Sequence, residues 1–322
     1  MRVLVTGGHG FVGRHLGEHL LKCGDDVALT YLPNARNEEA DNKYPIPKAV
    51  QSLALDITNK KAVDDLLALL RPDAVYHLAG LSFVPAQEND MNKVFAVNTF
   101  GTTNILDAVS KHAKKAKVLI VTSAEVYGEP RPGSLPLTEA AELRPVSLYG
   151  ASKAAADLMT FTYAFRDGVD AIRVRPFNHT GPGQSDHFSI AGFAKQVAAI
   201  KLGKASPKIL VGNLDAKSDF SDVSDIVRGY REALLNGKRG EAYNLCSGRS
   251  VEVKEMLNRL IAIAEIEAEI TVDESRLRPV DIVDIYGSYQ RAQKDFGWKP
   301  RIELDGTLSS LLAYWVEVLS KR

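Results

Sequence analysis

The chain has 322 residues, 45% of them apolar and 25% charged, and its 40 basic and 40 acidic residues leave a formal net charge of zero. This length favours two domains, or one large domain with a smaller lobe, and the composition excludes a disordered chain. The charge balance argues against nucleic acid or a membrane surface as a partner, and the two cysteines form no CxxC pair typical of a zinc site.

The first half of the chain alternates between short apolar strands and helical patterns. Strands are predicted at 2–6, 26–32, 51–55, 74–78, 117–122 and 170–174, and helices at 11–24, 60–70, 91–115 and 149–167. The strands are continuous apolar runs, which is typical of a parallel sheet with helices on both faces. We therefore predict an α/β fold built on a Rossmann doubly wound parallel sheet.

The rhythm changes after "RPFNHTGPG" at 175–183. Helical patterns at 187–202, 222–236, 252–265 and 305–319 alternate there with short strands and loops. We predict a first domain over 1–176, on which parts of 219–245 pack, and a smaller, partly interleaved α/β lobe over 177–322. No apolar run approaches the ~18 residues of a membrane span, and glycines follow the N-terminal apolar run too soon for a signal peptide. We expect a cytoplasmic protein.

A glycine-rich stretch, "TGGHGFVG" at 6–13, lies where the first strand turns into the first helix. Gly7, Gly10 and Gly13 have a GxxGxxG spacing. These glycines let the backbone turn tightly and let a pyrophosphate approach the helix N-terminus, where free N–H groups favour anions. The spacing alone also fits an ordinary turn, but its place in a βαβ unit favours dinucleotide binding.

The end of the second strand indicates which dinucleotide is bound. NAD sites usually place an acidic residue about 20 residues further on, to hold the ribose 2′-hydroxyl. This stretch reads "LTYLPNAR" and offers Tyr31, Asn34 and Arg36 instead. An arginine can pair with the 2′-phosphate of NADP. We predict NADPH as the cofactor, with NADH as the alternative if Arg36 is an ordinary solvated charge.

The first helix also carries "HLGEH" at 15–19, which fits the HxxEH pattern of some zinc enzymes. His15 and His19 share a helix face and could grip zinc. However, the helix begins at the phosphate loop and no third ligand is apparent. We expect a solvated helix face and no metal site.

A second group of residues suits proton transfer. "LYGASK" at 148–153 places Tyr149 four residues before Lys153 on one helix face, and Ser123 in "VTSAEVYG" follows a central strand. An ammonium group beside a tyrosine would lower its pKa from the usual value of about 10. The serine could hold a substrate oxygen while a nicotinamide exchanges hydride. Alone, the pair also fits a packing tyrosine and a surface lysine; the phosphate loop upstream favours a reaction centre.

Together, GxxGxxG, Asp56-Ile57, "HLAG" at 77–80, Asn98, "TSAEVYG" and "YGASK" resemble the extended short-chain dehydrogenase/reductase family over almost the whole chain. The resemblance implies an NADP-binding first domain, a nucleotide-sugar-binding lobe, and catalysis by Ser123, Tyr149 and Lys153. The cofactor contacts that it implies are Gly7, Gly10, Phe11, Val12, Gly13, Tyr31, Asn34, Arg36, Asp56, Ile57, Leu78, Ala79, Gly80, Asn98, Tyr149, Lys153 and Pro176.

Three stretches, "RPFNHTGPGQ", "VGNLDAKSDF" and "LRPVDI", look most like GDP-4-keto-6-deoxy-mannose reductases, with GDP-mannose 4,6-dehydratases next. The loop reads "GFVG" where the dehydratases show "GQDG". Their Thr-(Asp/Ser)-Glu run is Ser123-Ala124-Glu125 here, and Ala124 offers no proton. The resemblance therefore implies NADPH-dependent reduction of the C4 keto group to GDP-D-rhamnose. Tyr149 would deliver the proton, Ser123 would orient the carbonyl, and Lys153 would tune the tyrosine.

The resemblance also implies a set of substrate contacts, namely Ser82, Val84, Ser123, Glu125, Asn178, Lys195, Val211, Lys217 and Arg278. A structural role stays open for Asn178, Lys195 and Arg278, and we expect His179 to be a hydrogen-bonded loop histidine. Ser218 stands where the family has an arginine, and serine cannot make a bidentate phosphate contact. Either Lys217 or Arg278 holds the diphosphate, or the ligand differs from a GDP-sugar.

Three other functions fit parts of the pattern. An epimerase or dehydratase acting on another nucleotide sugar would retain its cofactor and need no added NADPH. A non-catalytic NADP-binding sensor usually lacks the tyrosine or lysine, both present here, and a small-ketone reductase would not need the long second lobe. Related enzymes pair through the 91–115 and 149–167 helices, which implies a homodimer.

Overall fold

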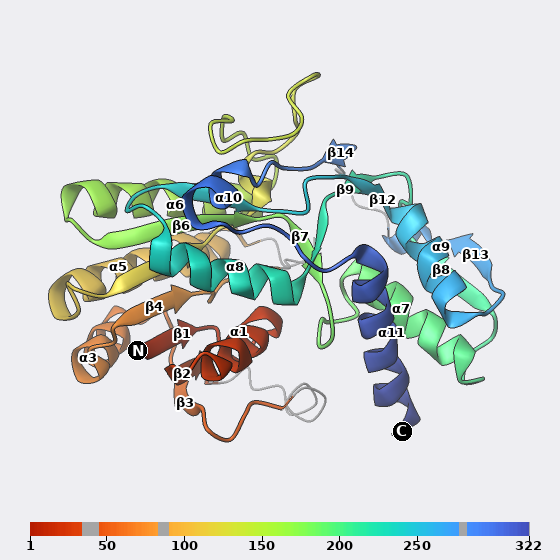
Figure 1. Cartoon of the computed structure of the whole chain (residues 1–322), viewed down its shortest axis with the longest axis horizontal. Helices are drawn as coiled ribbons and strands as arrows, with labels where there is room; N and C mark the ends of the chain where they lie inside the picture. The colour runs from red at the N-terminus through yellow and green to blue at the C-terminus, as the bar shows by residue number, and fades with distance from the viewer. Residues whose placement is uncertain (34–44, 83–89, 277–281, 322) are drawn as a thin grey trace.

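The computed structural model describes residues 1–33, 45–82, 90–276 and 282–321, and its largest element is a seven-stranded parallel sheet (Figure 1). The strand order is β11-β6-β5-β4-β1-β2-β3, which is the Rossmann order with one added strand. The strands are β1 (Arg2–Thr6), β2 (Asp26–Tyr31), β3 (Gln51–Ala54), β4 (Ala74–His77), β5 (Lys117–Val121), β6 (Asp170–Pro176) and β11 (Ala242–Leu245).

Helices cover both faces of this sheet (Figure 1). One face packs against α1 (Phe11–Lys22), α8 (Val223–Asn236) and α10 (Gln290–Phe296), and the other packs against α3 (Lys60–Leu70), α5 (Gly101–His112) and α6 (Leu148–Arg166). Each helix presents an apolar stripe to strands that are buried on both faces, as the continuous apolar runs predicted. The predicted doubly wound fold is confirmed. The short helix α10 was not predicted.

The remaining elements form a lobe with its own apolar core. Helices α7 (Ser189–Lys201), α9 (Val253–Ala264) and α11 (Leu304–Ser320) pack together beside the paired strands β8 (Lys208–Val211) and β13 (Glu269–Val272). The other short strands form two small sheets, one of β7 (Asn178–Thr180) with β10 (Phe220–Asp222), and one of β9 (Lys217–Ser218) with β12 (Val251–Glu252) and β14 (Asp284–Ile285).

The chain returns from the lobe to the sheet with α8 and β11, which lie within 219–245. We therefore keep the division into 1–176 and 177–322, with that return, as a proposal. Among the described residues, no helix is both long and apolar enough to cross a membrane.

The helix predicted over 91–115 is instead composed of three pieces. These are α4 (Met91–Phe95), a π-helical turn over Ala96–Phe100, and α5. The helix ends at His112 because Ala113 leaves the helical conformation, with φ of −141°. A π turn adds one residue to the turn and is frequent at functional sites. Here it carries Asn98.

Candidate active site

The loop between β1 and α1 has no room for side chains at Gly7 and Gly13, because neighbouring backbone atoms lie too close. Gly7 has a φ of 68°, and a Cβ there would lie 2.7 Å from the backbone of Ala79. A Cβ on Gly13 would lie 2.6 Å from the carbonyl oxygen of Gly7. The first helical residue is Phe11, and no side chain caps the helix at Gly10. The first N–H groups of α1 are therefore available to an anion, which fits the pyrophosphate of a dinucleotide.

The other predicted cofactor positions lie along the carboxyl edge of the sheet, where open α/β sheets bind their ligands. These positions are Tyr31 at the end of β2, Asp56 and Ile57 after β3, residues 78–80 after β4, and Pro176 at the end of β6. The Asp56 carboxylate accepts hydrogen bonds from the N–H and hydroxyl of Thr58, at 2.9 and 2.7 Å. Asn34 and Arg36 lie outside the described residues, so the 2′-phosphate contact stays a prediction.

Gly80 lies where Asn98 and Lys153 come together. A Cβ on Gly80 would lie 2.9 Å from Oδ1 of Asn98 and 3.1 Å from Nζ of Lys153. The buried Asn98 amide accepts a hydrogen bond from the N–H of Leu81 at 2.8 Å and donates to the Ser152 hydroxyl at 2.9 Å. Asn98 thus ties the segment after β4 to helix α6. Sequence reasoning missed Ser152, because a serine inside a helix gives no local signal of such a contact.

The turn after β5 and the first turn of α6 bring Ser123 and Tyr149 together. The Ser123 side chain acts on the Tyr149 phenol, whose pKa it lowers, and its hydroxyl accepts the N–H of Glu125 at 3.1 Å. Ser147 donates its hydroxyl to the Glu125 carboxylate at 2.9 Å and accepts the N–H of Gly150 at 2.9 Å. Ser147 therefore joins the two turns. It was missed, although a serine directly before a helix is the usual N-cap signal.

The expected lowering of the Tyr149 pKa is not found. Burial, together with the negative charge of Glu125, raises the pKa of Tyr149, and the hydrogen bond from Ser123 opposes this rise. The Lys153 ammonium donates to the carbonyl oxygen of Val121 at 2.9 Å, and burial lowers the pKa of Lys153 to about 8. Tyr149 is thus held as a protonated phenol, which suits a proton donor.

Two of the predicted substrate cations, Lys195 and Lys217, are already paired with carboxylates. Lys195, on α7, donates to Asp186 at 2.5 Å and lies over the Trp315 ring at 5.5 Å. Lys217, on β9, lies 3.2 Å from the Glu252 carboxylate. A diphosphate would have to displace these carboxylates from the lysines, or bind the lysines while the ion pairs remain in place.

The other predicted substrate residues are spread more widely. Ser82 and Asn178 are exposed, whereas Val84 and Arg278 lie outside the described residues. Val211 is fully buried in the core of the lobe. The structure gives the Val211 side chain a packing role in the lobe, and its substrate contact stays a prediction.

We predicted that His15 and His19 lie on a solvated face of α1, and for His15 this prediction is wrong. His15 Nε2 lies 2.7 Å from the carbonyl oxygen of Pro182, so the ring is engaged with another segment. Among the described residues, no group of three His, Cys, Asp or Glu side chains could hold a metal ion. His179 is hydrogen-bonded to the Phe177 carbonyl oxygen at 2.9 Å, as expected for a loop histidine.

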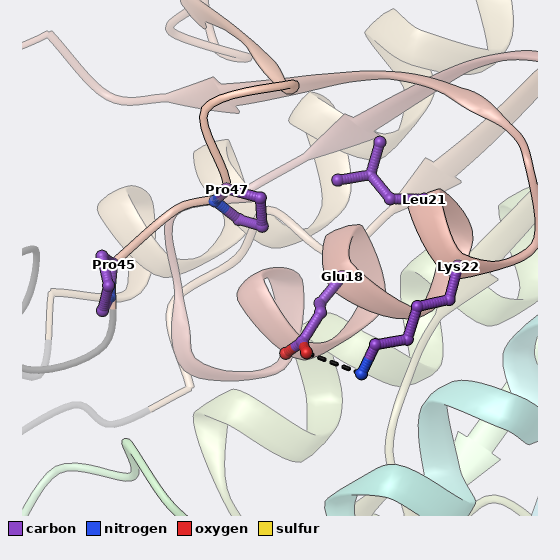
Figure 2. Close-up of a pocket in the computed structure, with 5 residues that line it drawn as sticks. All are labelled: Glu18, Leu21, Lys22, Pro45 and Pro47. Atoms are coloured by element: carbon purple, nitrogen blue, oxygen red, sulfur yellow. Dashed lines mark ion pairs between the residues drawn. The ribbon is translucent and has the colours of Figure 1, made fainter.

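A hollow of about 580 Å³ lies beside α1, apart from these residues. Figure 2 shows its lining: Glu18, Leu21 and Lys22 of α1, with Pro45 and Pro47 from the segment before β3. The Glu18–Lys22 ion pair, at 2.7 Å, is part of this lining (Figure 2). None of these five residues belongs to the glycine-rich loop or to the Ser/Tyr/Lys group, so we keep the candidate site at the carboxyl edge of the sheet.

Comparison with known proteins decides the family. A family model described as GDP-mannose 4,6 dehydratase matches residues 4–311. The chain belongs to this family. Its expected membership of the extended short-chain dehydrogenase/reductases is thereby confirmed.

Two curated relatives in this group match nearly full length. The GDP-6-deoxy-D-mannose reductase of Pseudomonas aeruginosa is 34% identical over 98% of this chain and 97% of its own. The GDP-6-deoxy-D-talose 4-dehydrogenase of Aggregatibacter actinomycetemcomitans is 31% identical over 89% of this chain and 88% of its own. A solved structure of RMD from P. aeruginosa, complexed with NADPH, matches with a TM-score of 0.84 and 33% identity, over 98% of this chain and 97% of that one.

Proposed function

We propose that this chain uses NADPH to reduce the C4 keto group of GDP-4-keto-6-deoxy-mannose, giving GDP-D-rhamnose, in the cytoplasm. The observation that carries the proposal is Ser123 next to the Tyr149 phenol, whose pKa it lowers, with the buried Lys153 one helical turn after the tyrosine, in a chain 34% identical to a GDP-6-deoxy-D-mannose reductase. The glycine-rich loop fits the dinucleotide, and NADH is the alternative donor.

Bound NADPH supplies the hydride, and the chain's own residues manage the proton. Tyr149, whose pKa is raised by burial, donates its phenolic proton to the oxygen at C4. Ser123 hydrogen-bonds to the same oxygen and orients the carbonyl. Lys153, beside Gly80 and Asn98, places a positive charge that stabilises the phenolate left behind.

The run Ser123-Ala124-Glu125 favours reduction over dehydration. Ala124 is buried and has no proton to offer, and the Glu125 carboxylate accepts the hydroxyl of Ser147. A dehydratase needs an acid and a base here in addition to the tyrosine. A nucleotide-sugar dehydratase or epimerase remains the second candidate, since the matching family model is described as a dehydratase.

The test is to mix the purified protein with NADPH and GDP-4-keto-6-deoxy-mannose and follow the absorbance of the reduced nicotinamide. The proposal expects NADPH consumption matched by a GDP-6-deoxyhexose, whose C4 configuration separates the rhamno from the talo product. Conversion of a nucleotide sugar by tightly held cofactor, with no net NADPH oxidation, would support the epimerase or dehydratase instead. Reduction of a UDP- or dTDP-keto sugar in place of the GDP compound would show that Ser218 marks a change of ligand.

We expect kcat/KM for reduction to fall as pH rises through about 8, the pKa to which burial lowers Lys153. Lys153 carries its positive charge below that pH and loses it above, and kcat/KM reports groups of the free enzyme. Lys153→Arg, which stays charged, should have a lower rate without the alkaline fall. If the fall persisted in Lys153→Arg, another group would be responsible for it.

We also propose a homodimer that buries the outer side of α6. Leu158, Phe161 and Phe165 are exposed on this helix at spacings of three and four residues, so they share one face. Phe100 and Met91, on the neighbouring π turn and α4, are exposed as well. Contiguous exposed apolar side chains of this kind mark protein–protein contacts.

Replacing this surface should therefore separate the subunits. Leu158→Glu combined with Phe165→Glu should convert a dimer into a monomer in sedimentation velocity, because it places charges in an apolar contact. The control is Leu69→Glu, on α3, which is 80% exposed and lies outside this surface. A monomeric unmodified protein, or a double variant that stays dimeric, would rule out this interface.

A further inference from the structure

Two histidines from distant parts of the chain meet beside the glycine-rich loop. His15 lies on α1, one turn after Phe11, and His179 lies in β7. The Phe11 and His15 rings meet edge to face, with centroids 5.4 Å apart and planes at 83°. The Phe11 and His179 rings are stacked, with centroids 6.3 Å apart and planes at 14°. The first residue of the phosphate-binding helix therefore contacts both histidines.

His15 also bonds directly to the segment after β7. Its Nε2 lies 2.7 Å from the carbonyl oxygen of Pro182. A carbonyl oxygen only accepts, so Nε2 carries the proton and donates it. This segment lies between α1 and the lobe helices α7 and α11 (Figure 1). The bond thus joins the helix of the first domain to the chain that enters the lobe.

The segment that receives this bond is braced by its own side chains. His179 donates from Nδ1 to the Phe177 carbonyl oxygen at 2.9 Å. The Gln184 side chain accepts the Thr180 hydroxyl at 2.6 Å and donates to the His179 carbonyl oxygen at 3.0 Å. We call residues 177–184 the crossing loop. Because these hydrogen bonds hold the crossing loop together, we expect a restraint at Pro182 to affect Asn178, a predicted substrate contact.

Burial keeps both histidine rings neutral near pH 7, against the opposing effect of nearby carboxylates. Burial lowers the pKa of His15 and of His179. Asp222 opposes this lowering at both rings, Glu18 opposes it at His15, and Lys22 adds to it at His15. Neutral imidazoles can stack on an aromatic ring and still donate one N–H each, which is the arrangement seen here.

We propose that Phe11, His15 and His179 couple the two ligand sites, so that a dinucleotide bound at the start of α1 tightens binding of a nucleotide diphosphate at the crossing loop. A pyrophosphate held by the first turn restrains Phe11, and its ring contacts pass this restraint to the crossing loop. The loop then loses less freedom when the second ligand binds. The identity of the two ligands rests on the proposed function, whereas the coupling rests on the contacts. His15 is a positioning residue in this scheme.

The coupling is measured by titrating GDP calorimetrically into the protein with and without saturating NADP⁺, which permits no turnover. In the unmodified protein NADP⁺ should lower the Kd of GDP by about fivefold or more, within the usual range for coupled sites. His15→Leu, which keeps bulk but loses the donor, should bring this factor near one while GDP alone binds as before. His15→Gln keeps a side-chain N–H and should restore most of it.

Two further variants keep the test independent of one substitution. His179→Leu should reduce the factor as His15→Leu does, so it serves if His15→Leu does not fold. His112→Gln, on the far side of the sheet at the end of α5, is the matched control and should leave the factor unchanged. Reciprocity requires that GDP tighten NADP⁺ binding by the same factor in each variant.

Each outcome bears on a separate claim. Equal GDP affinity with and without NADP⁺ in the unmodified protein overturns the coupling and leaves the proposed reductase intact. If NADP⁺ lowers the Kd of GDP in both His15→Leu and His179→Leu by the same factor as in the unmodified protein, the role of these residues is overturned. Failure of the unmodified protein to bind GDP at all, even with NADP⁺, overturns the GDP assignment, and the coupling to GDP falls with it.

Discussion

Tyr149→Phe should lower kcat by about 10²–10⁴-fold, the range associated with losing a positioned general acid. Burial raises the pKa of the Tyr149 phenol, which keeps its proton available near neutral pH, and Ser123 lies next to it. Phenylalanine keeps the ring and removes only that hydroxyl. The Kd of NADPH, measured by fluorescence titration, should change less than twofold by comparison, because binding energy for the cofactor comes from other contacts.

The matched control is Tyr163→Phe, a hydroxyl removed from the same helix. Tyr163 donates to Asp107 at 2.5 Å, away from the site, so this variant should lose about 1 kcal/mol of stability and keep its turnover. Comparable turnover in Tyr149→Phe and the unmodified protein would refute the proposed mechanism. Equal losses in both variants would point to helix α6 as a whole instead of to the phenol.

Gly13→Ala should weaken NADPH binding strongly, because it adds a methyl group inside the phosphate loop. Its Cβ would lie 2.6 Å from the carbonyl oxygens of Gly7 and Gly8 and from the Cα of Gly8. These are all backbone atoms of the phosphate loop, so the loop must open to accommodate the methyl group. We expect the Kd of NADPH to rise at least tenfold, and the free energy of unfolding to fall by about 1–3 kcal/mol.

Gly306→Ala provides the comparison, since it adds the same methyl group to helix α11. The nearest atom to its Cβ would be 3.8 Å away, so no contact is strained. Alanine in a helix should raise stability by up to about 1 kcal/mol and leave the Kd of NADPH unchanged. If Gly13→Ala bound NADPH as tightly as Gly306→Ala does, the pyrophosphate would not lie at the start of α1.

The sequence by itself was sufficient for the large sheet and for the order of its parts. Buried parallel strands are continuous apolar runs, and α3 begins and ends where its pattern predicted, over 60–70. The glycine-rich loop was equally clear, because its backbone conformation excludes other residues at Gly7 and Gly13. Ser123, Tyr149 and Lys153 were also found from the sequence, since short motifs and their family resemblance preserve the local spacing.

Other features depend on contacts between segments that are far apart in the chain. The π turn places Asn98 so that its side chain forms hydrogen bonds with Leu81 and Ser152. The hydrophobic periodicity of the sequence contains no signal for these long-range contacts. The burial of Val211 depends on how the lobe helices pack over β8. Helix α10 is seven residues long and relies on packing against the sheet for its stability.

The sign of the Tyr149 pKa shift is the clearest case of what tertiary structure alone decided. The spacing of Tyr149 and Lys153 suggested an ammonium acting on a phenol, but the lysine head bonds to Val121 and burial dominates at the tyrosine. The same holds for His15, which the helix pattern placed toward solvent and which bonds instead to Pro182. Sequence spacing specifies which residues can be neighbours on one element, whereas desolvation and long-range hydrogen bonds depend on the other elements that pack against it.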